Sequence, residues 1–318
     1  MERLTNETVL VTGGSGFIGS NLVKGLLSKG IKKIIVLDTK IDKNSIYAIE
    51  NLNSKTTFKE VDIRKRNLLF KVIKFFNPSY IFHLAAEPIV ENAFLNPYKT
   101  FQTNVIGTVN VLDAAREIKS LKGIIIASSD KAYGKTTKAY DELSPLRGDH
   151  PYDVSKSAAD LIAYAYYKSY GLPVVITRFG NVYGEGDFHF GRIIPDICKS
   201  IIKNETLLLR SDGTYVRDYV YVKDVVDGYI FLLKNLKKTI GEAFNFSSKD
   251  NLSVINLIKE AEKILDVKIK YKIVNNAKNE IPYQHLKDKK IKRLGWKNNY
   301  NLENTLKNVL RWYNLLLQ

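Results

Sequence analysis

Cysteine is nearly absent from this chain, which has one cysteine in 318 residues. A disulfide needs two cysteines, so Cys198 cannot form an internal disulfide and the fold has to hold without such links. The segment from Met1 to Leu10 also lacks the basic and then apolar plan of a signal peptide. Together these absences favour a protein that works in the cytoplasm.

Long apolar runs, internal repeats and low-complexity linkers are missing as well. No stretch approaches the roughly 20 apolar residues that a membrane helix needs, so we expect no membrane insertion. The formal net charge is +16, but the lysines are scattered and no basic helix or aromatic ribonucleoprotein motif occurs, which disfavours a nucleic-acid partner. The charge then indicates either a lysine-rich surface or a basic field that attracts a pyrophosphate-bearing substrate.

A glycine loop stands between a short strand and a helix near the start of the chain. The β-branched run 8–12 precedes the glycines, and apolar residues at helical spacing follow until Gly30. Gly13, Gly16 and Gly19 let the backbone turn tightly and place a pyrophosphate on the amides of a helix N-terminus. The pattern therefore predicts a dinucleotide site that includes the loop residues Gly13, Gly16, Phe17, Ile18 and Gly19.

A second strand, 33–37, ends at Asp38. A carboxylate at this position can accept hydrogen bonds from the adenosine ribose hydroxyls, and it repels a 2′-phosphate. The cofactor is therefore predicted to be NAD rather than NADP. Lys40 is the one nearby residue that would suit NADP instead.

Strands and helices continue to alternate as far as a strand over 172–177, which predicts an α/β fold with a Rossmann-type, doubly wound parallel sheet. The alternation ends after Gly184, where a smaller C-terminal lobe begins. The two lobes are predicted to be interleaved in sequence. The NAD-binding domain takes residues 1–180 and about 215–248, and the substrate-binding domain takes 181–214 and about 249–318.

The stretch that carries the chemistry follows the apolar run 123–127. Ser129, Asp130 and Lys131 should emerge at the carboxyl end of that strand, where open α/β sheets bind ligands. About twenty residues later, Tyr152 and Lys156 are four residues apart on one face of a helix that begins behind a proline. These groups together predict a site that moves protons and a hydride at a sugar carbon.

The motifs taken in order resemble the extended short-chain dehydrogenase/reductase family that acts on nucleotide sugars, over nearly the whole chain. Within that family the Ser-Ser-Asp-Lys-Ala-Tyr-Gly and Pro-Tyr-Asp-Val-Ser-Lys patterns look most like CDP-glucose 4,6-dehydratases and their close relatives. The resemblance implies that Asp62 and Ile63 flank the adenine of NAD. It also adds Leu84, Ala85, Ala86 and Asn104 to the cofactor site, with Tyr152 and Lys156 beside the nicotinamide.

The same resemblance implies roles for the catalytic residues. Ser129 would bind the sugar O4, Tyr152 would remove its proton, and Lys156 would favour the phenolate of the tyrosine. Elimination of water across C5 and C6 would then need an acid and a base. Asp130 is assigned as the acid and Lys131 as the base or proton relay, although many sugar dehydratases carry a glutamate where Lys131 stands. The alternative is that these two form a surface salt bridge at a strand end.

In the second lobe Asn181, Arg192 and Arg217 are candidates for binding the substrate pyrophosphate, which suits charge-assisted donors.

No metal is expected in the site. His83, inside a buried strand, is interpreted as a packing residue. The helices near 97–119 and 152–170 carry more apolar positions than one sheet face can cover, so we expect them to pair in a homodimer.

Three functions are compatible with these residues. The leading hypothesis is an NAD-dependent nucleotide-sugar 4,6-dehydratase, and the first alternative is a nucleotide-sugar 4-epimerase, which needs only Ser129, Tyr152 and Lys156. The third, a noncatalytic dinucleotide-binding or nucleic-acid-associated protein, is disfavoured because that set of three is intact.

Overall fold

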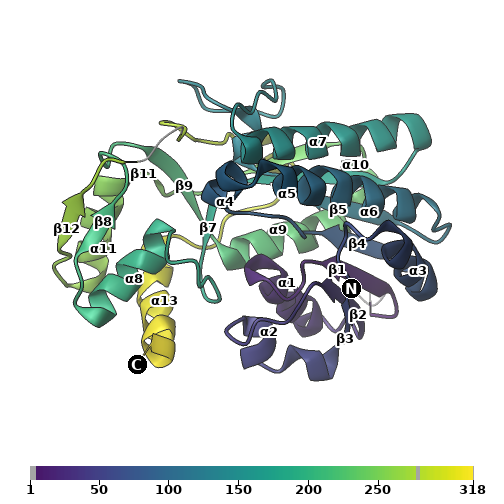
Figure 1. Cartoon of the computed structure of the whole chain (residues 1–318), viewed down its shortest axis with the longest axis horizontal. Coiled ribbons are helices and arrows are strands. Elements are labelled where there is room, and N and C mark those ends of the chain that lie inside the picture. The colour runs from purple at the N-terminus through teal and green to yellow at the C-terminus, as the bar shows by residue number, and fades with distance from the viewer. Residues whose placement is uncertain (1–4, 277–279, 318) are drawn as a thin grey trace.

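The structure is a computed structural model that describes residues 5–276 and 280–317 (Figure 1). Outside the described residues lie 1–4, which belong to the N-terminal segment without a signal-peptide pattern. Residues 277–279 and 318, which belong to the predicted substrate-binding domain, lie outside them too. Within the described part of the chain, no helix is long and apolar enough to cross a membrane.

A seven-stranded parallel sheet forms the centre of the larger lobe, in the order β10-β6-β5-β4-β1-β2-β3. All six strand pairs run parallel. The predicted doubly wound sheet is thereby confirmed. Its strands are β1 Thr8–Thr12, β2 Lys33–Asp38, β3 Thr57–Glu60, β4 Tyr80–His83, β5 Gly123–Ala127, β6 Val174–Phe179 and β10 Ala243–Phe246.

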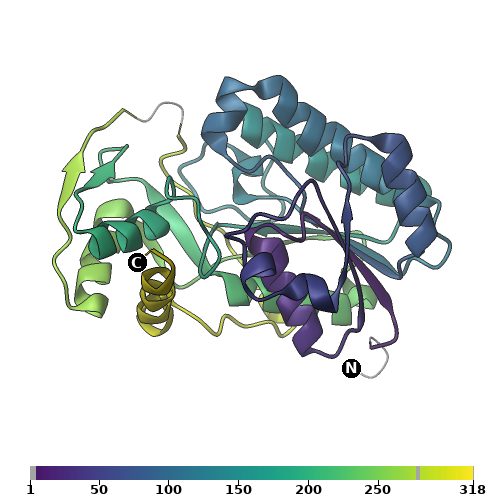
Figure 2. The ribbon, with the colours of Figure 1, turned by 60° about the horizontal axis from the view of Figure 1, so that its bottom comes forward.

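Helices cover both faces of this sheet (Figure 2). Val9 and Val11 of β1 belong to the core under α1 (Phe17–Ser28) and α9 (Val222–Lys234), whereas Leu10 belongs to the core under the other helices. The side chains of a strand alternate between faces, so a continuous apolar strand is what two covered faces require. The second face is covered by α3 (Arg66–Phe76), α6 (Gly107–Arg116) and α7 (Pro151–Tyr170).

The helix expected after Pro97 is interrupted. It comprises α5 (Pro97–Phe101), a π-helical turn η2 (Gln102–Ile106) and α6. A π turn inserts an extra residue into the helical repeat and therefore changes which side chains share a face. The remaining short elements are α2 Ile46–Ile49, η1 Leu52–Lys55, α4 Val90–Leu95, η3 Asp130–Tyr133, α10 Leu236–Thr239 and α12 Lys289–Arg293.

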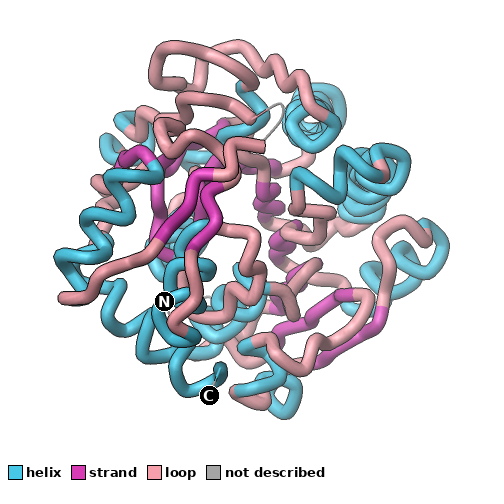
Figure 3. The backbone as a smooth tube through the Cα atoms, turned by 60° about the vertical axis from the view of Figure 1, so that its left-hand side comes forward, coloured by secondary structure: helices cyan, strands magenta, loops and turns pink. Residues whose placement is uncertain are grey.

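The smaller lobe holds two further sheets, beside the helices at the left of Figure 1. One has the order β11-β9-β7, and the other pairs β12 with β8. Their strands are β7 Asn181–Tyr183, β8 Leu207–Leu209, β9 Val216–Tyr221, β11 Asn251–Ser253 and β12 Tyr271–Ile273, and the helices are α8 Ile193–Lys203, α11 Val254–Leu265 and α13 Leu302–Leu317. The strands of the molecule form more than one group, as Figure 3 shows in magenta, in agreement with the three sheets.

The chain crosses between the two lobes more than once. After the strands of the small lobe it returns to form β10 at the edge of the main sheet. Ile291 and Trp296 also pack into the core of the large lobe, where the Trp296 ring lies edge-on to Phe246 with centroids 4.9 Å apart. The predicted range 249–318 therefore contains a segment that packs with the main sheet, and the division into domains stays a prediction.

Candidate active site

A cavity of about 1560 Å³ lies at the carboxyl ends of the central strands and extends into the small lobe. Its walls include almost every site residue predicted from the sequence. These residues are Gly13, Gly16, Phe17, Ile18, Gly19, Asp38, Asp62, Ile63, Leu84, Ala85, Ala86, Ser129, Asp130, Lys131, Tyr152, Lys156, Asn181, Arg192 and Arg217.

The glycine loop approaches its neighbours too closely for side chains. Gly13 has a φ of +70°, and a Cβ there would lie 2.7 Å from the backbone nitrogen of Ala85. A Cβ on Gly19 would lie 2.0 Å from the carbonyl oxygen of Gly13. The N-cap Gly16 has no side chain to satisfy the first amides of α1, so these amides are available to an anion such as a pyrophosphate.

Asp38 ends β2 at the cavity wall, with its carboxylate held in place. Its Oδ2 accepts hydrogen bonds from the Ser15 amide at 3.2 Å and the Ser15 hydroxyl at 2.8 Å, and its Oδ1 accepts one from the Thr39 amide at 2.8 Å. An oriented carboxylate suits ribose hydroxyls. The sequence did not indicate a role for Ser15, and its two hydrogen bonds to Asp38 show that it orients this carboxylate.

Asp62 and Ile63 line the cavity after β3. The Asp62 carboxylate already pairs with Arg64 at 2.6 Å, and this hydrogen-bonded pair lowers the pKa of Asp62 below its ordinary value. Ile63 packs against Gly107, where a Cβ would lie 2.5 Å from the isoleucine Cδ1. The residues present along this wall fit a dinucleotide cofactor.

Asn104 is not brought to the cavity wall. It lies buried in the π turn, accepts a hydrogen bond from the Glu87 amide at 2.7 Å, and donates to the Glu87 carbonyl at 3.1 Å and to Ser155 Oγ at 2.9 Å. Both amide hydrogens of Asn104 are thus donated to protein atoms, and its contact with the cofactor stays a prediction. Asn104 instead joins the Glu87 loop to α7.

His83 is a packing residue, as expected. Its ring nitrogens lie 2.7 Å from Thr12 Oγ1 and 3.0 Å from Thr108 Oγ1 inside the sheet. Burial, with a smaller contribution from the Lys156 charge, lowers the pKa of His83 to about 3. The imidazole is therefore neutral at ordinary pH.

Tyr152 and Lys156 come from the first turns of α7. Pro151 occupies the first helical position, and the His150 side chain caps the helix by accepting from the Tyr152 amide at 3.4 Å. Lys156 Nζ donates to the Ala127 carbonyl at 2.9 Å and lies 6.0 Å from the centroid of the Tyr152 ring. Both side chains therefore lie beside the end of β5.

The pKa shifts of this pair differ from the sequence prediction. Burial lowers the pKa of Lys156 to about 8. Burial also raises the pKa of Tyr152, with a further increase from the Asp130 charge, while a hydrogen bond with Ser129 acts in the opposite direction. Lys156 donates its ammonium hydrogen to a backbone carbonyl, and its effect on the phenolate of Tyr152 stays a prediction.

Ser129, Asp130 and Lys131 begin the short helix η3 at the end of β5. Ser129 is its N-cap: Oγ accepts from the Lys131 amide at 3.2 Å and donates to Asp130 Oδ1 at 3.0 Å. Asp130 is only 3% exposed. Burial raises the pKa of Asp130 and, helped by the Arg217 charge, lowers the pKa of Lys131. The alternative of a surface salt bridge is therefore wrong.

Gln284 connects the two side chains and was not found from the sequence. This fully buried glutamine donates from Nε2 to Asp130 Oδ2 at 2.8 Å and accepts at Oε1 from Lys131 Nζ at 3.2 Å. Among the residues that the structure describes, Asp130 and Lys131 form no direct ion pair. A single glutamine in a loop carries no motif, so only its tertiary position identifies it.

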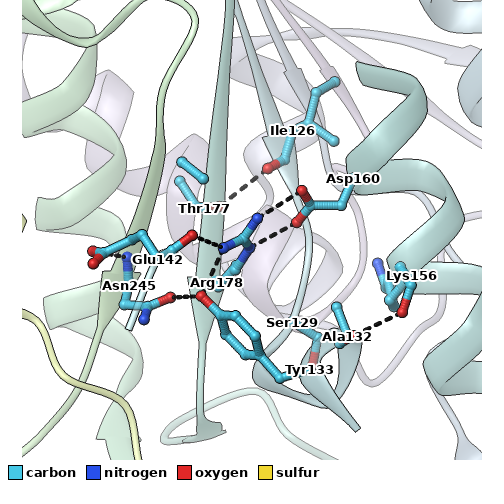
Figure 4. Close-up of polar contacts among 12 residues, drawn as sticks. Ile126, Ser129, Ala132, Tyr133, Glu142, Lys156, Asp160, Thr177, Arg178 and Asn245 are labelled. Atoms are coloured by element: carbon cyan, nitrogen blue, oxygen red, sulfur yellow. Dashed lines mark hydrogen bonds and ion pairs between the residues drawn. The ribbon is translucent and has the colours of Figure 1, made fainter. Parts of the chain in front are cut away.

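A buried polar network supports η3 from behind (Figure 4). Arg178 makes two hydrogen bonds of 2.8 Å to the Asp160 carboxylate and one of 2.6 Å to the Tyr133 hydroxyl. Tyr133 in turn donates to Asn245 Oδ1 at 2.7 Å. Because the charges are paired and hydrogen-bonded, they can stay buried and hold the loop in one geometry.

The three candidates for the pyrophosphate lie in the small lobe part of the cavity. Asn181 comes from β7, and Arg192 precedes α8 and contacts Asp187 at 3.0 Å. The Arg217 side chain is buried in β9 and contacts Glu280 at 3.2 Å. Each arginine is thus already oriented by a carboxylate.

Among the described residues, no group of three or more His, Cys, Asp or Glu side chains is placed to hold a metal ion.

The model of the NAD dependent epimerase/dehydratase family matches residues 9–246. The chain therefore belongs to this family. A curated relative is a trifunctional UDP-glucose 4,6-dehydratase/UDP-4-keto-6-deoxy-D-glucose 3,5-epimerase/UDP-4-keto-L-rhamnose-reductase of Arabidopsis thaliana, 32% identical over 98% of this chain and 48% of the relative. The chain thus spans about half the length of that relative. The CDP-glucose 4,6-dehydratase of Salmonella typhimurium is 30% identical over 96% of this chain and 90% of its own.

Two solved structures illustrate the range of activities that share this fold. One is DesIV, a dTDP-glucose 4,6-dehydratase from Streptomyces venezuelae with NAD bound, at 29% identity, a TM-score of 0.88 and coverage of 97% of both chains. The other is the UDP-glucose 4-epimerase of Thermotoga maritima with UDP-glucose, at 30% identity and a TM-score of 0.88, covering 98% of this chain and 100% of that one.

Proposed function

We propose that this protein is an NAD-dependent nucleotide-sugar 4,6-dehydratase. It would oxidise C4 of the sugar, eliminate water across C5 and C6, and reduce C6 to give a 4-keto-6-deoxy sugar nucleotide. The observation that carries the proposal is the placement of Asp130 and Lys131, which line the cavity together with Ser129 and Tyr152 instead of pairing in solvent. Elimination needs one group that removes a proton and one that supplies a proton, and these two side chains provide them.

The cofactor site is assigned to the glycine loop and Asp38. The first amides of α1, which the N-cap Gly16 leaves without a side-chain partner, would hold the pyrophosphate of NAD, and Asp38 would accept from a ribose. When bound, NAD accepts a hydride from C4 and returns it to C6. The backbone of Ala85 lies against Gly13, and a side chain at position 13 would clash with it.

Oxidation at C4 is assigned to Ser129, Tyr152 and Lys156. Ser129 would orient O4, and Tyr152 would take its proton. The Asp130 charge is one cause of the raised pKa of Tyr152, and burial raises the pKa of Asp130 too. When Asp130 is protonated, its negative charge no longer opposes ionisation of Tyr152. The protonated carboxyl group is also the form that an acid catalyst needs.

Elimination is assigned to the two residues after Ser129. Once C4 is a ketone, the C5 proton is acidic, and Lys131 would remove it. Burial and Arg217 lower the pKa of Lys131, which makes a neutral amine more accessible. Asp130 would donate a proton to the C6 hydroxyl as it leaves as water.

Arg192, Arg217 and Asn181 are proposed to bind the pyrophosphate of the sugar nucleotide at the small lobe end of the cavity. The relatives are named for UDP-, dTDP- and CDP-linked sugars. The proposal therefore extends to a nucleotide sugar as substrate and leaves the base to experiment.

A substrate panel read by mass spectrometry tests the proposal. The protein is incubated with NAD and UDP-, dTDP-, CDP- or GDP-glucose, and at least one substrate should lose the mass of one water. Asp130→Asn and Lys131→Met should each stop this loss. A product of unchanged mass and altered chromatographic mobility would contradict the proposal.

That contrary result would indicate a 4-epimerase, which is the second candidate. The epimerase candidate is supported by the structure of the Thermotoga maritima epimerase, which is as similar to this chain by TM-score as the structure of DesIV is. The backbone fold thus does not separate the two activities. The dehydratase is preferred because an epimerase has no need for Asp130 and Lys131.

A further inference from the structure

Both arginines proposed for the substrate pyrophosphate contact a carboxylate, but the two carboxylates differ in how firmly they are held. Asp187 is 1% exposed, and both of its carboxylate oxygens lie 3.0 Å from Arg192 Nη1. Its Oδ1 also accepts a hydrogen bond from the His189 amide at 3.2 Å. Glu280, by contrast, accepts a single hydrogen bond among the described residues, from Arg217 Nη2 at 3.2 Å, and 31% of its side chain is exposed. Burial and a second donor therefore fix Asp187 but not Glu280.

Arg217 has little surface to offer to an anion. Only 7% of its side chain is exposed, and its Nη1 already donates to the Val216 carbonyl at 2.9 Å. The Glu280 carboxylate takes the other terminal nitrogen, and both side chains line the cavity. A guanidinium buried to this extent needs a partner for its charge, because an unpaired ion in the interior is strongly unfavourable. In the structure Glu280 is that partner.

The backbone that follows Glu280 is anchored next to Arg217. The Val216 amide donates to the Pro282 carbonyl at 2.9 Å, and the Gln284 amide donates to the Val216 carbonyl at 3.1 Å. The Glu280 carboxylate stands outside these backbone contacts, at the end of a side chain that turns about its single bonds. It can therefore turn into solvent while the backbone, with Gln284, stays in place.

We propose that Glu280 is an internal competitor for the pyrophosphate of the nucleotide sugar: it holds Arg217 until the substrate binds and then gives it up. This inference rests on the proposed binding of that pyrophosphate by Arg217. Two anions on so small an exposed surface of one guanidinium repel each other at close range. The pyrophosphate carries the larger charge and displaces the carboxylate, which gains water instead. As the product leaves, Glu280 returns to Arg217.

Glu280→Gln tests the competition, because it removes the charge and nearly keeps the shape of the side chain. UDP, dTDP, CDP and GDP are the probes, and NAD-saturated protein is used because NAD has a pyrophosphate of its own. For the diphosphate that binds most tightly to the wild type, calorimetry should show a dissociation constant about tenfold lower in the variant, a change of about 1.4 kcal/mol. Glu280→Ala should tighten binding as well.

The dependence on salt distinguishes competition from a purely structural effect of the substitution. The gain in affinity of Glu280→Gln over the wild type should become smaller at high ionic strength, because salt screens the repulsion between partly exposed charges. Thermal melting and NAD affinity of the variant should match the wild type.

Glu50→Gln is the matched control. Glu50 also belongs to an ion pair, 2.6 Å from Lys24, and its side chain is 36% exposed, but it is not among the residues that line the cavity. This variant loses the same charge and should bind the diphosphate as the wild type does.

Arg217→Lys separates a failure of this inference from a failure of the proposed site. It should weaken diphosphate binding by about tenfold or more, because a lysine cannot reproduce the fork of the guanidinium. If it does so while Glu280→Gln weakens binding or leaves it unchanged, the competitor role is overturned and the pyrophosphate site stands. If Arg217→Lys binds like the wild type, the pyrophosphate lies elsewhere, and the proposed site fails together with the role of Glu280. Binding is measured without turnover, so the result does not depend on whether the enzyme dehydrates or epimerises.

Discussion

At the scale of single residues, the proposed chemistry depends on groups whose pKa values the fold has shifted. Tyr152, Asp130 and Lys131 all carry pKa values displaced by burial, and the displacement has the sign that favours the neutral form of each. A neutral Asp130 can donate a proton and a neutral Lys131 can accept one, whereas Tyr152 has to lose its own proton before it can act on O4. Perturbed groups that share one cavity are also the pattern expected of a catalytic site.

Tyr152→Phe should abolish oxidation at C4, because the substitution removes the only group assigned to the O4 proton. The rate should fall by about 10² to 10⁴, and no reduced cofactor should form in a single turnover. Tyr164→Phe, on an exposed part of the same helix, is the control and should retain activity. Unchanged activity in Tyr152→Phe would support a noncatalytic dinucleotide-binding protein.

At the scale of elements, the site depends on the loop 280–286, which crosses from the small lobe to the end of β5. Its Gln284 amide donates to the Val216 carbonyl at 3.1 Å, and its side chain connects Asp130 with Lys131. Asp130 and Lys131, the side chains proposed for elimination, are thus held by a residue more than 150 positions away in the chain.

Gln284→Leu should keep the volume of this side chain and remove both of its hydrogen bonds. Each partner left unsatisfied in the interior costs about 1–3 kcal/mol, so the free energy of unfolding should decrease by an amount of this order. Dehydration should slow while C4 oxidation persists. Chemical denaturation and single-turnover kinetics measure the two effects. Gln102→Leu, outside the cavity wall, is the control. Loss of oxidation together with dehydration would contradict this separation.

At the scale of the whole molecule, one side of the large lobe exposes apolar side chains. On α7, Leu161 is 55% exposed and Tyr164 is 46% exposed, and Leu95 and Tyr98 from the neighbouring α4 and α5 are also exposed. A surface of this kind is typical of an interface between proteins. It supports the homodimer that the sequence suggested through helices 97–119 and 152–170.

Light scattering tests this assembly. Wild-type protein should have the mass of a dimer at micromolar concentration, and the double substitution Leu161→Glu with Tyr164→Glu should give a monomer, because four buried charges would face each other across the interface. Leu143→Glu changes an equally apolar residue that is 94% exposed on a loop and should leave the dimer intact. A monomeric wild-type protein would contradict the prediction.

The sequence by itself determined the parallel sheet, the glycine loop and the set Ser129, Tyr152 and Lys156, because each follows from local periodicity or from short spacings along the chain. It did not predict the π turn in which Asn104 lies or the hydrogen bonds that this side chain makes with Glu87 and Ser155. Only the tertiary structure decided that Asp130 is buried, that Lys131 is partly buried and that Gln284 joins them. Those relations depend on contacts between distant segments, and burial, which shifts the pKa values, is a property of the packed chain rather than of any one stretch.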